Sequence, residues 1–256
     1  MDQDGIGAPA RALREAGHVV VLTGAGVSAE SGIPTFRDTM EGLWAEFDPQ
    51  QLATPEAFAT NPELVTRWYD HRRLGCAACE PNPGHLALAR MEREICALGA
   101  EFTLLTQNVD GLHRRAGNTD PVELHGSVMT WRCSRTGAGV TPPPLPEPWA
   151  EFPPMSPAGA PVRPDVVWFG EALPEAALER SFAALETCDL LLSVGTSSVV
   201  YPAAGFIELA SANGARTIEV NPKDTPMSSI VTWALRGKSA QILPALVGQA
   251  FESPSS

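Results

Sequence analysis

The 256-residue sequence predicts an α/β fold, in which a doubly wound parallel sheet carries a helical insertion and a second, small proline-rich module. Three observations predict this fold. Short apolar runs alternate with helix-like segments, as in a parallel sheet covered by helices on both faces. Residues 35–81 show helical periodicity. The stretch 128–164 is dense in proline, which excludes regular helix and central strand.

The elements of the predicted sheet follow one another along the whole chain. A helix over 9–17 ends at a glycine and leads into an apolar, β-branched strand over 19–22, which is typical of a strand buried on both faces. A turn is expected at 82–85, where Asn, Pro and Gly stand together. The remaining strands are expected at 102–105, 122–124, 190–194 and 217–220, and the remaining helices at 85–98, 174–187, 202–213 and 239–249.

These elements divide the chain into a core and two additions. We expect one domain over residues 1–256, because 256 residues suffice for one large domain with a smaller module. The sheet core is expected at about 8–34, 82–127 and 165–250, the helical insertion at about 35–81, and the proline-rich module at about 128–164.

The net charge indicates which classes of partner the protein can bind, and the cysteine content indicates its compartment. The formal net charge of −12 disfavours nucleic acid and anionic membranes as partners, since both need a basic surface, whereas a basic peptide is tolerated. No apolar stretch reaches transmembrane length, and we expect no signal peptide. Five cysteines without a framework spacing indicate reduced thiols, so we expect a cytoplasmic protein.

The strand at 19–22 runs directly into a glycine turn. Gly24, Gly26 and Ala29 satisfy the permissive form of the dinucleotide-binding fingerprint, and Ser28 suits a helix N-cap. A strand, glycine turn and helix in this order would present backbone N–H groups to an anion. The pattern also fits an ordinary glycine turn after a core strand, because such short motifs match by accident.

The segment after the turn departs from a hydride-transfer domain. Residues 31–38 follow at once and leave no room for a long crossover helix. No acidic residue closes a second strand about 20 residues on; Glu41 and Asp48 are in range, but no strand is evident around them. The sequence therefore predicts a nucleotide site with an unusual loop over it.

Five motifs in order make the sequence similar to the sirtuins, the NAD-consuming protein lysine deacylases. The first is Gly24-Ala25-Gly26-Val27-Ser28 followed by Gly32-Ile33-Pro34 and Phe36-Arg37. The others are Thr106 to His113 (TQNVDGLH), Glu123 to Ser127 (ELHGS), Arg163 to Glu171 (RPDVVWFGE), and Val194 to Ser197 (VGTS) with Val220-Asn221-Pro222. The resemblance runs from about residue 19 to 246 and implies a Rossmann-like core, with NAD as a co-substrate.

The resemblance also implies the reaction and its residues. An acyl group passes from a lysine side chain to ADP-ribose, and free lysine, nicotinamide and O-acyl-ADP-ribose result. His125 is the expected general base, since a histidine titrates near neutrality, and Asn108 and Asp110 organise the reacting ribose. From the residues alone, His125 can equally be a buried structural histidine, and Asn108 with Asp110 an Asx turn. The expected cofactor-binding residues are Gly24, Ala25, Gly26, Ser28, Phe36, Arg37, Gln107, Asn108, Val109, Asp110, Gly195, Thr196, Ser197, Asn221 and Ser239.

The expected substrate is an acylated lysine side chain of a protein. Val167, Phe169, Gly170 and Glu171 resemble the edge that pairs with a substrate peptide by strand addition. Tyr69 and Arg72 stand three apart, which puts both on one helix face. A phenol and a guanidinium together can hold a carboxylate, as this pair does in the sirtuins that remove succinyl and malonyl groups. A core aromatic residue beside a solvated arginine is the alternative.

The sequence departs from most sirtuins at the structural zinc site. Cys133 stands where the first Cys-x-x-Cys pair begins, but Thr136 takes the second position and no cysteine follows until Cys188. One thiolate cannot make a four-ligand tetrahedral site, and Cys76 with Cys79 has no second pair. We therefore expect no zinc, with the proline-rich stretch stiffening the module instead.

Two other functions remain open at this stage. The same pocket with a different nucleophile would make an NAD-dependent ADP-ribosyltransferase. A chain that has lost peptide turnover would be a non-catalytic NAD-binding module. The missing zinc ligands favour this alternative, whereas the intact Asn108, Asp110 and His125 disfavour it.

Overall fold

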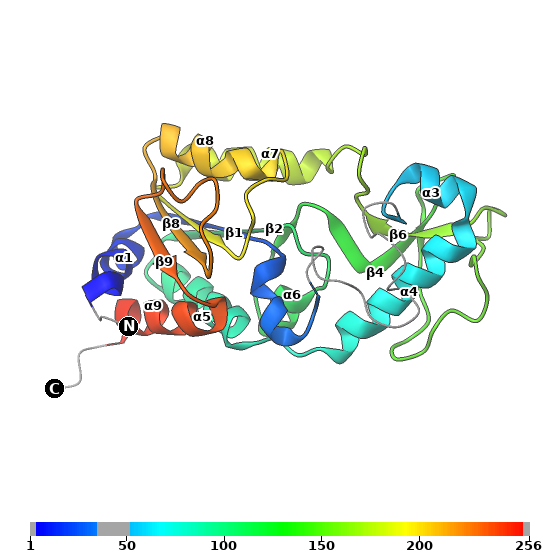
Figure 1. The fold of residues 1–256 in the computed structure, drawn as a ribbon, viewed down its shortest axis with the longest axis horizontal. Coiled ribbons are helices and arrows are strands. Elements are labelled where there is room, and N and C mark those ends of the chain that lie inside the picture. Colours follow the sequence, from blue (N-terminus) through cyan, green and yellow to red (C-terminus); the bar gives the residue numbers. More distant parts are fainter. Residues whose placement is uncertain (1–3, 35–51, 253–256) are drawn as a thin grey trace.

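The computed structural model describes residues 4–34 and 52–252, which form two lobes (Figure 1). The larger lobe holds a parallel sheet and the helices that cover it. The smaller lobe, on the right in Figure 1, holds α3, α4, β4 and β6. The predicted α/β fold with its doubly wound parallel sheet is confirmed.

Every described strand of the main sheet runs parallel to its neighbours, in the order β3-β2-β1-β7-β8-β9. The central β1 reads His-Val-Val-Val-Leu-Thr and is buried along its whole length, because helices cover both faces. The strands are β1 His18–Thr23, β2 Glu101–Thr106, β3 Val122–Glu123, β7 Leu190–Val194, β8 Arg216–Asn221 and β9 Trp233–Arg236.

Two apolar cores sandwich this sheet. Val19 and Val21 of β1 point into the first core, with α1 (Asp4–Glu15), α5 (Pro83–Ala97) and α9 (Ser239–Phe251). Val20 and Leu22 point into the second, with α7 (Glu175–Thr187) and α8 (Phe206–Ala212). The alternation of β1 between the two cores is the packing signature of a doubly wound sheet.

The smaller lobe joins two separate segments of the chain over one core. Antiparallel strands β4 (Gly126–Cys133), β5 (Gly139–Val140) and β6 (Val162–Val166) form a sheet in the order β5-β4-β6. Helix α4 (Pro62–Ala78) packs on it, and α3 (Pro55–Thr60) packs against α4. Because Trp68 and Tyr69 of α4 share a core with Val128 and Trp131 of β4, the helical insertion and the proline-rich module pack as one unit.

The expectation that the stretch 128–164 contains no central strand is wrong, because its prolines lie outside the central strand β4. Central β4 contains no proline, whereas Pro164 lies in β6, at an edge of the sheet as described. An edge strand tolerates proline because the missing N–H has no partner to lose. The strands extend just beyond the expected bounds of the module on both sides, at 126 and 166.

A buried ion pair on α4 holds the proline-rich stretch in place. The Asp70 and Arg73 side chains are 2% and 1% exposed, and Arg73 Nε donates to Asp70 Oδ1 at 2.9 Å. Arg73 also donates to the carbonyls of Pro143 and Glu147, and Asp70 accepts the N–H of Trp149. All donors and acceptors of the pair that face this stretch are thereby satisfied, as burial of charge requires.

Several element boundaries differ from those expected. Helix α1 begins at Asp4, with Pro9 inside it, and α5 begins at Pro83, inside the expected turn, with Asn82 as its N-cap. The helix expected at 202–213 is divided into the 3₁₀ helix η4 (Ala203–Gly205) and α8, and the short helix α6 (Leu112–Ala116) and strand β9 were not predicted. No helix within residues 4–34 and 52–252 is long and apolar enough to cross a membrane.

Candidate active site

The carboxyl ends of four parallel strands lie side by side. Thr23 at the end of β1 is in register with Thr106 of β2 and Val194 of β7, and Val194 is in register with Val220 of β8. The turns that follow, which carry most predicted site residues, therefore meet at one edge of the sheet. In an open α/β sheet this is the edge at which ligands bind.

The glycine turns after β1 and β7 touch through their backbones. A Cβ atom on Gly24 would lie 2.8 Å from Thr196 Cα, and one on Gly26 would lie 2.7 Å from the carbonyl oxygen of Gly195. Gly195 has φ +60°, and its Cβ would lie 2.5 Å from the Val27 nitrogen. Real Cβ atoms do not approach backbone so closely, so glycine is required at all three positions.

The turn after β1 corrects the predicted strand–turn–helix unit. Residues Ala25–Val27 and Ala29–Ser31 form two 3₁₀ turns, η1 and η2, and Ser28 between them makes no side-chain cap. The N–H groups of Gly24 and Gly26 donate to the carbonyls of Val194 and Gly195 at 3.0 and 2.8 Å. These amides are taken up by the packing of the two turns, so the expectation that they are free for an anion is wrong.

Ser28 instead lies at the centre of a buried polar network. Its Oγ donates to Asp110 Oδ2 at 2.7 Å and accepts from Asn108 Nδ2 at 3.1 Å. The second carboxylate oxygen of Asp110 accepts the N–H of Leu112, at the start of α6. Ser28, Asn108 and Asp110 are 1%, 8% and 4% exposed. Three residues predicted for the NAD site are thus in mutual contact.

Two buried histidines that were not predicted as site residues belong to this network. His85 Nε2 lies 3.3 Å from Ser28 Oγ, and His113 Nε2 lies 2.9 Å from Thr23 Oγ1. Since both hydroxyls donate elsewhere, to Asp110 and Thr106, each Nε2 carries the proton, and each Nδ1 has no partner among the described residues. Burial lowers the pKa of both rings, so they are neutral.

His125 is oriented by a backbone carbonyl. Its Nδ1 lies 3.0 Å from the oxygen of Gln107, which can only accept, so Nδ1 carries the proton and Nε2 holds the lone pair. Burial lowers the pKa of His125, and the hydrogen bond to Gln107 opposes this only in part. The ring is therefore neutral near pH 7, with one basic nitrogen available, which is the state that a general base requires.

A second chain of contacts joins the turns after β2, β7 and β8. Gln107 Nε2 donates to Thr196 Oγ1 at 3.1 Å, and Asn221 Nδ2 donates to the Thr196 carbonyl at 2.8 Å. Ser197 lies next to Thr196 in the turn after β7. In the turn after β2, the carbonyl of Val109 accepts the Val128 N–H. The structure thus brings the predicted residues of these turns together, although they are far apart in sequence.

Ser198 is a further candidate that the sequence did not single out. It has φ +54°, a strained value for a residue with a side chain, and its buried Oγ has no partner among the described residues. An orphaned hydroxyl at the ligand edge of the sheet fits a site for a polar ligand. Its only sequence signal is its position next to Ser197.

The remaining predicted cofactor residues are Ser239 and two residues of the loop after Pro34. The Ser239 hydroxyl is buried and donates to Glu30 at 3.3 Å, and the same carboxylate accepts the Ala240 N–H at the start of α9. Glu30 thus occupies the start of α9, where Ser239 was predicted to contact the cofactor. Phe36 and Arg37, also predicted for the cofactor, lie outside the described residues.

The predicted acyl pair lies on α4, in the core of the smaller lobe. Tyr69 is 3% exposed, and its hydroxyl accepts the indole N–H of Trp168 at 3.0 Å. Burial raises the pKa of Tyr69 to about 12, although the nearby charge of Arg72 lowers it. The Arg72 guanidinium lies 4.8 Å from the Trp68 ring centroid. The two side chains share one neighbourhood, as their spacing predicts.

Most backbone N–H groups of the predicted peptide edge already donate hydrogen bonds within the protein. The N–H groups of Val167, Phe169 and Glu171 donate to carbonyls of His125, Ala53 and Trp168. Glu171 accepts the Trp168 N–H and holds Arg163 with two bonds, at 2.6 and 2.9 Å. Strand addition here would therefore rely on carbonyl acceptors. Val167 and Glu171 line a cavity of about 370 Å³ with Gly126, Arg132, Asp165, Val166, Ala172 and Pro174.

The Cys133 thiol accepts a hydrogen bond from a neighbouring turn. Ser156 Oγ donates to its Sγ at 3.1 Å, and this bond with others from Thr136 and Arg135 lowers the pKa of the buried thiol to about 6. Within the described residues no three His, Cys, Asp or Glu side chains cluster as a metal site would need. The absence of zinc stays a prediction.

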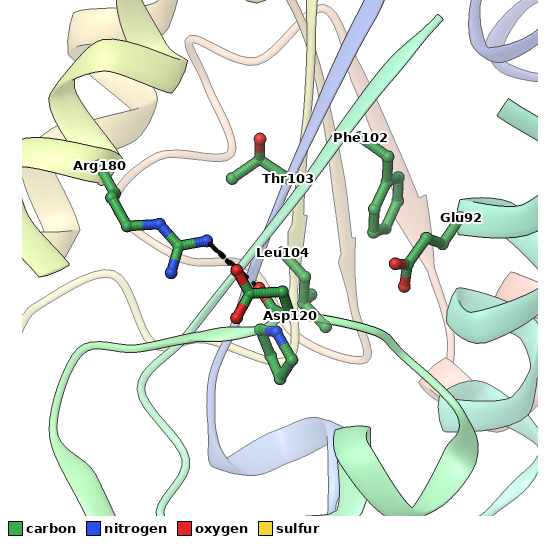
Figure 2. A pocket seen from close by; sticks show the side chains of 7 residues that line it. Glu92, Phe102, Thr103, Leu104, Asp120 and Arg180 are labelled. Carbon is green, nitrogen blue, oxygen red and sulfur yellow. Dashed lines mark hydrogen bonds and ion pairs between the residues drawn. The ribbon is translucent and has the colours of Figure 1, made fainter. Parts of the chain in front are cut away.

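Figure 2 shows a smaller cavity with a different set of lining residues. It measures about 140 Å³ and contains the ion pair between Arg180 and Asp120, at 2.7 Å. Phe102, Thr103 and Leu104 of β2 line it, near the amino end of the strand. No predicted site residue lines this cavity, so it is separate from the candidate active site.

Comparison with known proteins identifies the family. The Sir2 family model matches residues 24–202. NAD-dependent protein deacylase 1 of Pseudomonas aeruginosa is 50% identical over 245 residues, which cover 93% of this chain and 96% of that protein. The crystal structure of a Sir2 homologue–NAD complex superposes with a TM-score of 0.86 at 40% identity, covering 95% of this chain and 93% of that one.

A second solved structure contains a peptide. A Sir2 protein with a deacetylated p53 peptide and 3′-O-acetyl ADP ribose superposes with a TM-score of 0.81 at 29% identity, covering 94% of this chain and 97% of that one. The matches extend over nearly the full length of both partners and include the edge of the sheet at which the predicted residues meet. The chain belongs to the Sir2 family and is an enzyme of that family.

Proposed function

We propose that this enzyme is an NAD-dependent protein lysine deacylase that removes acetyl groups and also acidic acyl groups such as succinyl and malonyl. The orientation of His125 carries the proposal. Its proton is fixed on Nδ1 by the carbonyl of Gln107, the residue before the buried Asn108, which leaves the lone pair on Nε2 as a base. The relatives named NAD-dependent protein deacylases support the same activity.

The residues present fit a nicotinamide dinucleotide. Asn108 offers an amide that both donates and accepts, and Asp110 offers a carboxylate, which suit a carboxamide and sugar hydroxyls. The unpartnered Ser198 hydroxyl lies in the turn after β7 that the sequence assigns to NAD. Bound NAD would supply the departing nicotinamide and the ribose that receives the acyl group. His125 Nε2 would take the proton of a ribose hydroxyl, while Ser28 and Asn108 hold Asp110 in place.

Acidic acyl groups are proposed from Tyr69 and Arg72. A buried phenol that stays neutral and a guanidinium beside it form a donor pair for a carboxylate. We further propose that residues 1–256 act as one catalytic domain in the cytoplasm, without zinc, on acyl-lysine side chains of proteins. The five free cysteines and the net charge of −12 support the compartment and the absence of a nucleic-acid or membrane partner.

Incubation of the protein with NAD and acetyl-, succinyl- or malonyl-lysine peptides, read by mass spectrometry, tests the proposal. Deacylation is expected as a peptide that loses its acyl mass together with one nicotinamide and one O-acyl-ADP-ribose. ADP-ribosylated protein without peptide deacylation would favour the transferase alternative, and NAD binding without either product would favour the non-catalytic one. His125→Ala should lower turnover by about 10²–10⁴-fold while NAD binding, measured by calorimetry, persists.

A further inference from the structure

Trp168 forms the only described hydrogen bond of the Tyr69 hydroxyl. The indole Nε1–H donates to Tyr69 Oη at 3.0 Å, in a core where Tyr69 is 3% and Trp168 2% exposed. The two ring centroids lie 6.2 Å apart. Within residues 4–34 and 52–252, Tyr69 has no acceptor for its own proton. The phenol therefore receives one hydrogen bond and keeps one to give.

The geometry of a phenol makes this contact directional. The hydroxyl proton prefers the plane of the ring and so points to one of two sides of the oxygen. A donor on one side excludes that orientation, because two hydrogens would face each other. The indole N–H therefore turns the Tyr69 proton away from Trp168. Because the phenol is neutral, with its pKa raised by burial, this proton is present at physiological pH.

Two further contacts hold Trp168 in place. Its backbone N–H donates to Glu171 at 2.9 Å, and the guanidinium of Arg163 lies 3.3 Å from the centroid of its ring. Arg163 is fixed in turn by two bonds to Glu171 and one to the carbonyl of Val166. A cation on the indole face draws electron density from the ring, which strengthens the N–H as a donor. The donor is thus rigid and polarised.

We propose that Trp168 is a positioning residue for acyl specificity, whose indole N–H turns the Tyr69 hydroxyl so that it donates to the carboxylate of an acidic acyl chain. This inference rests on the proposed function. An acetyl group carries no carboxylate, so its removal does not need the oriented proton. Trp168 therefore selects among acyl groups without touching the chemistry at His125.

The test compares Trp168→Phe with wild type on matched acetyl- and succinyl-lysine peptides. Phenylalanine keeps an aromatic face under Arg163 but removes the N–H. The expected result is a rise in KM of about tenfold for the succinyl peptide, with kcat and deacetylation changed less than about twofold. Because Trp131 Nε1 donates to the Val128 carbonyl in the same core, Trp131→Phe is the matched control and should leave the acyl preference unchanged.

A double-mutant cycle shows whether Trp168 acts through Tyr69. Tyr69→Phe alone should reproduce the selective loss, and Trp168→Phe should add nothing in that background. Equal loss on both peptides, no loss on either, or losses that multiply in the double variant would overturn the inference while leaving the deacylase intact. A wild-type protein that deacetylates but ignores succinyl-lysine would overturn both the inference and the acidic-acyl part of the proposed function.

Discussion

The Ser28 hydroxyl donates to Asp110 Oδ2 at 2.7 Å, and so links the turn after β1 to the turn after β2 beneath the candidate site. Both residues are buried, and Asp110 also accepts the N–H that begins α6. A single carboxylate therefore organises three segments. Its loss should affect folding and ligand binding together.

Asp110→Asn is the sharpest test of that link. The amide group keeps one acceptor but turns an NH₂ toward either Ser28 or Leu112, so one buried bond is lost at a cost of about 1–3 kcal/mol. Thermal unfolding with and without NAD measures both effects. We expect a lower Tm and a smaller NAD-induced shift; a variant with wild-type Tm and full NAD shift would contradict the role assigned to Asp110.

Gly195→Ala should be strongly destabilising because its Cβ would meet fixed backbone 2.5 Å away and φ is +60°. Gly214→Ala is the control, since φ is +93° there and no atom lies within 4 Å. The control isolates the cost of a positive φ, about 1–2 kcal/mol. Urea unfolding should show a clearly larger loss for Gly195→Ala. Equal losses would mean that the contact between the turns is loose.

The stability of the fold should decline as the pH falls below the ordinary histidine pKa. Burial holds the pKa of His85 and His113 below 6.5, so between the folded and unfolded values only the unfolded chain binds protons. Their contribution is full above pH 6.5 and shrinks from there downward. Urea unfolding at about pH 7 and about pH 5 measures it. His113→Gln, which retains a donor for Thr23, should flatten the dependence; an unchanged slope would contradict it.

Arg72→Met should separate the two classes of acyl substrate. Removing the guanidinium deletes the charged partner of a carboxylate, so desuccinylation should fall by about 100-fold with little change in deacetylation. Arg67→Met is the matched control on the same helix, since Arg67 is exposed and pairs only with Glu63 among described carboxylates. Steady-state kinetics on both peptides decide the matter, and equal loss on both would remove the acidic-acyl proposal.

The smaller lobe should fold without a metal. The Asp70–Arg73 pair pins the proline-rich stretch to α4, and Ser156 bonds Cys133. Elemental analysis of purified protein should find no stoichiometric zinc, and a chelator should leave Tm unchanged. One zinc per chain would show that the ligand assignment is mistaken.

The sequence predicted the core of the sheet well because its strands are apolar runs that end at distinctive turns. β1, β2, β7 and β8 lie within a residue or two of the predicted positions. Strand β9 was missed because Trp-Ala-Leu-Arg has neither alternation nor a β-branched run, and α6 because it is only five residues long. Local pattern is weak evidence for such short elements.

The site was harder to predict than the sheet, because several of its backbone and side-chain groups also bond to other segments of the protein. The sequence placed Ser28, Asn108 and Asp110 after strand ends that meet at one edge, and their side chains are joined through the Ser28 hydroxyl. It could not show that the amides of Gly24 and Gly26 are already used, that Glu30 caps α9, or that Trp168 donates to Tyr69. Each of these depends on contacts between distant segments.

The abutting glycines of the turns after β1 and β7 have an evolutionary consequence. Because Gly24, Gly26 and Gly195 are demanded by steric crowding alone, a descendant that had stopped using dinucleotides would still need all three in order to fold. The glycine pattern would outlive the activity. A degenerate copy would be recognised first by decay of its buried polar side chains, such as Asn108 and Asp110, which the fold can replace more cheaply than it can admit a methyl group.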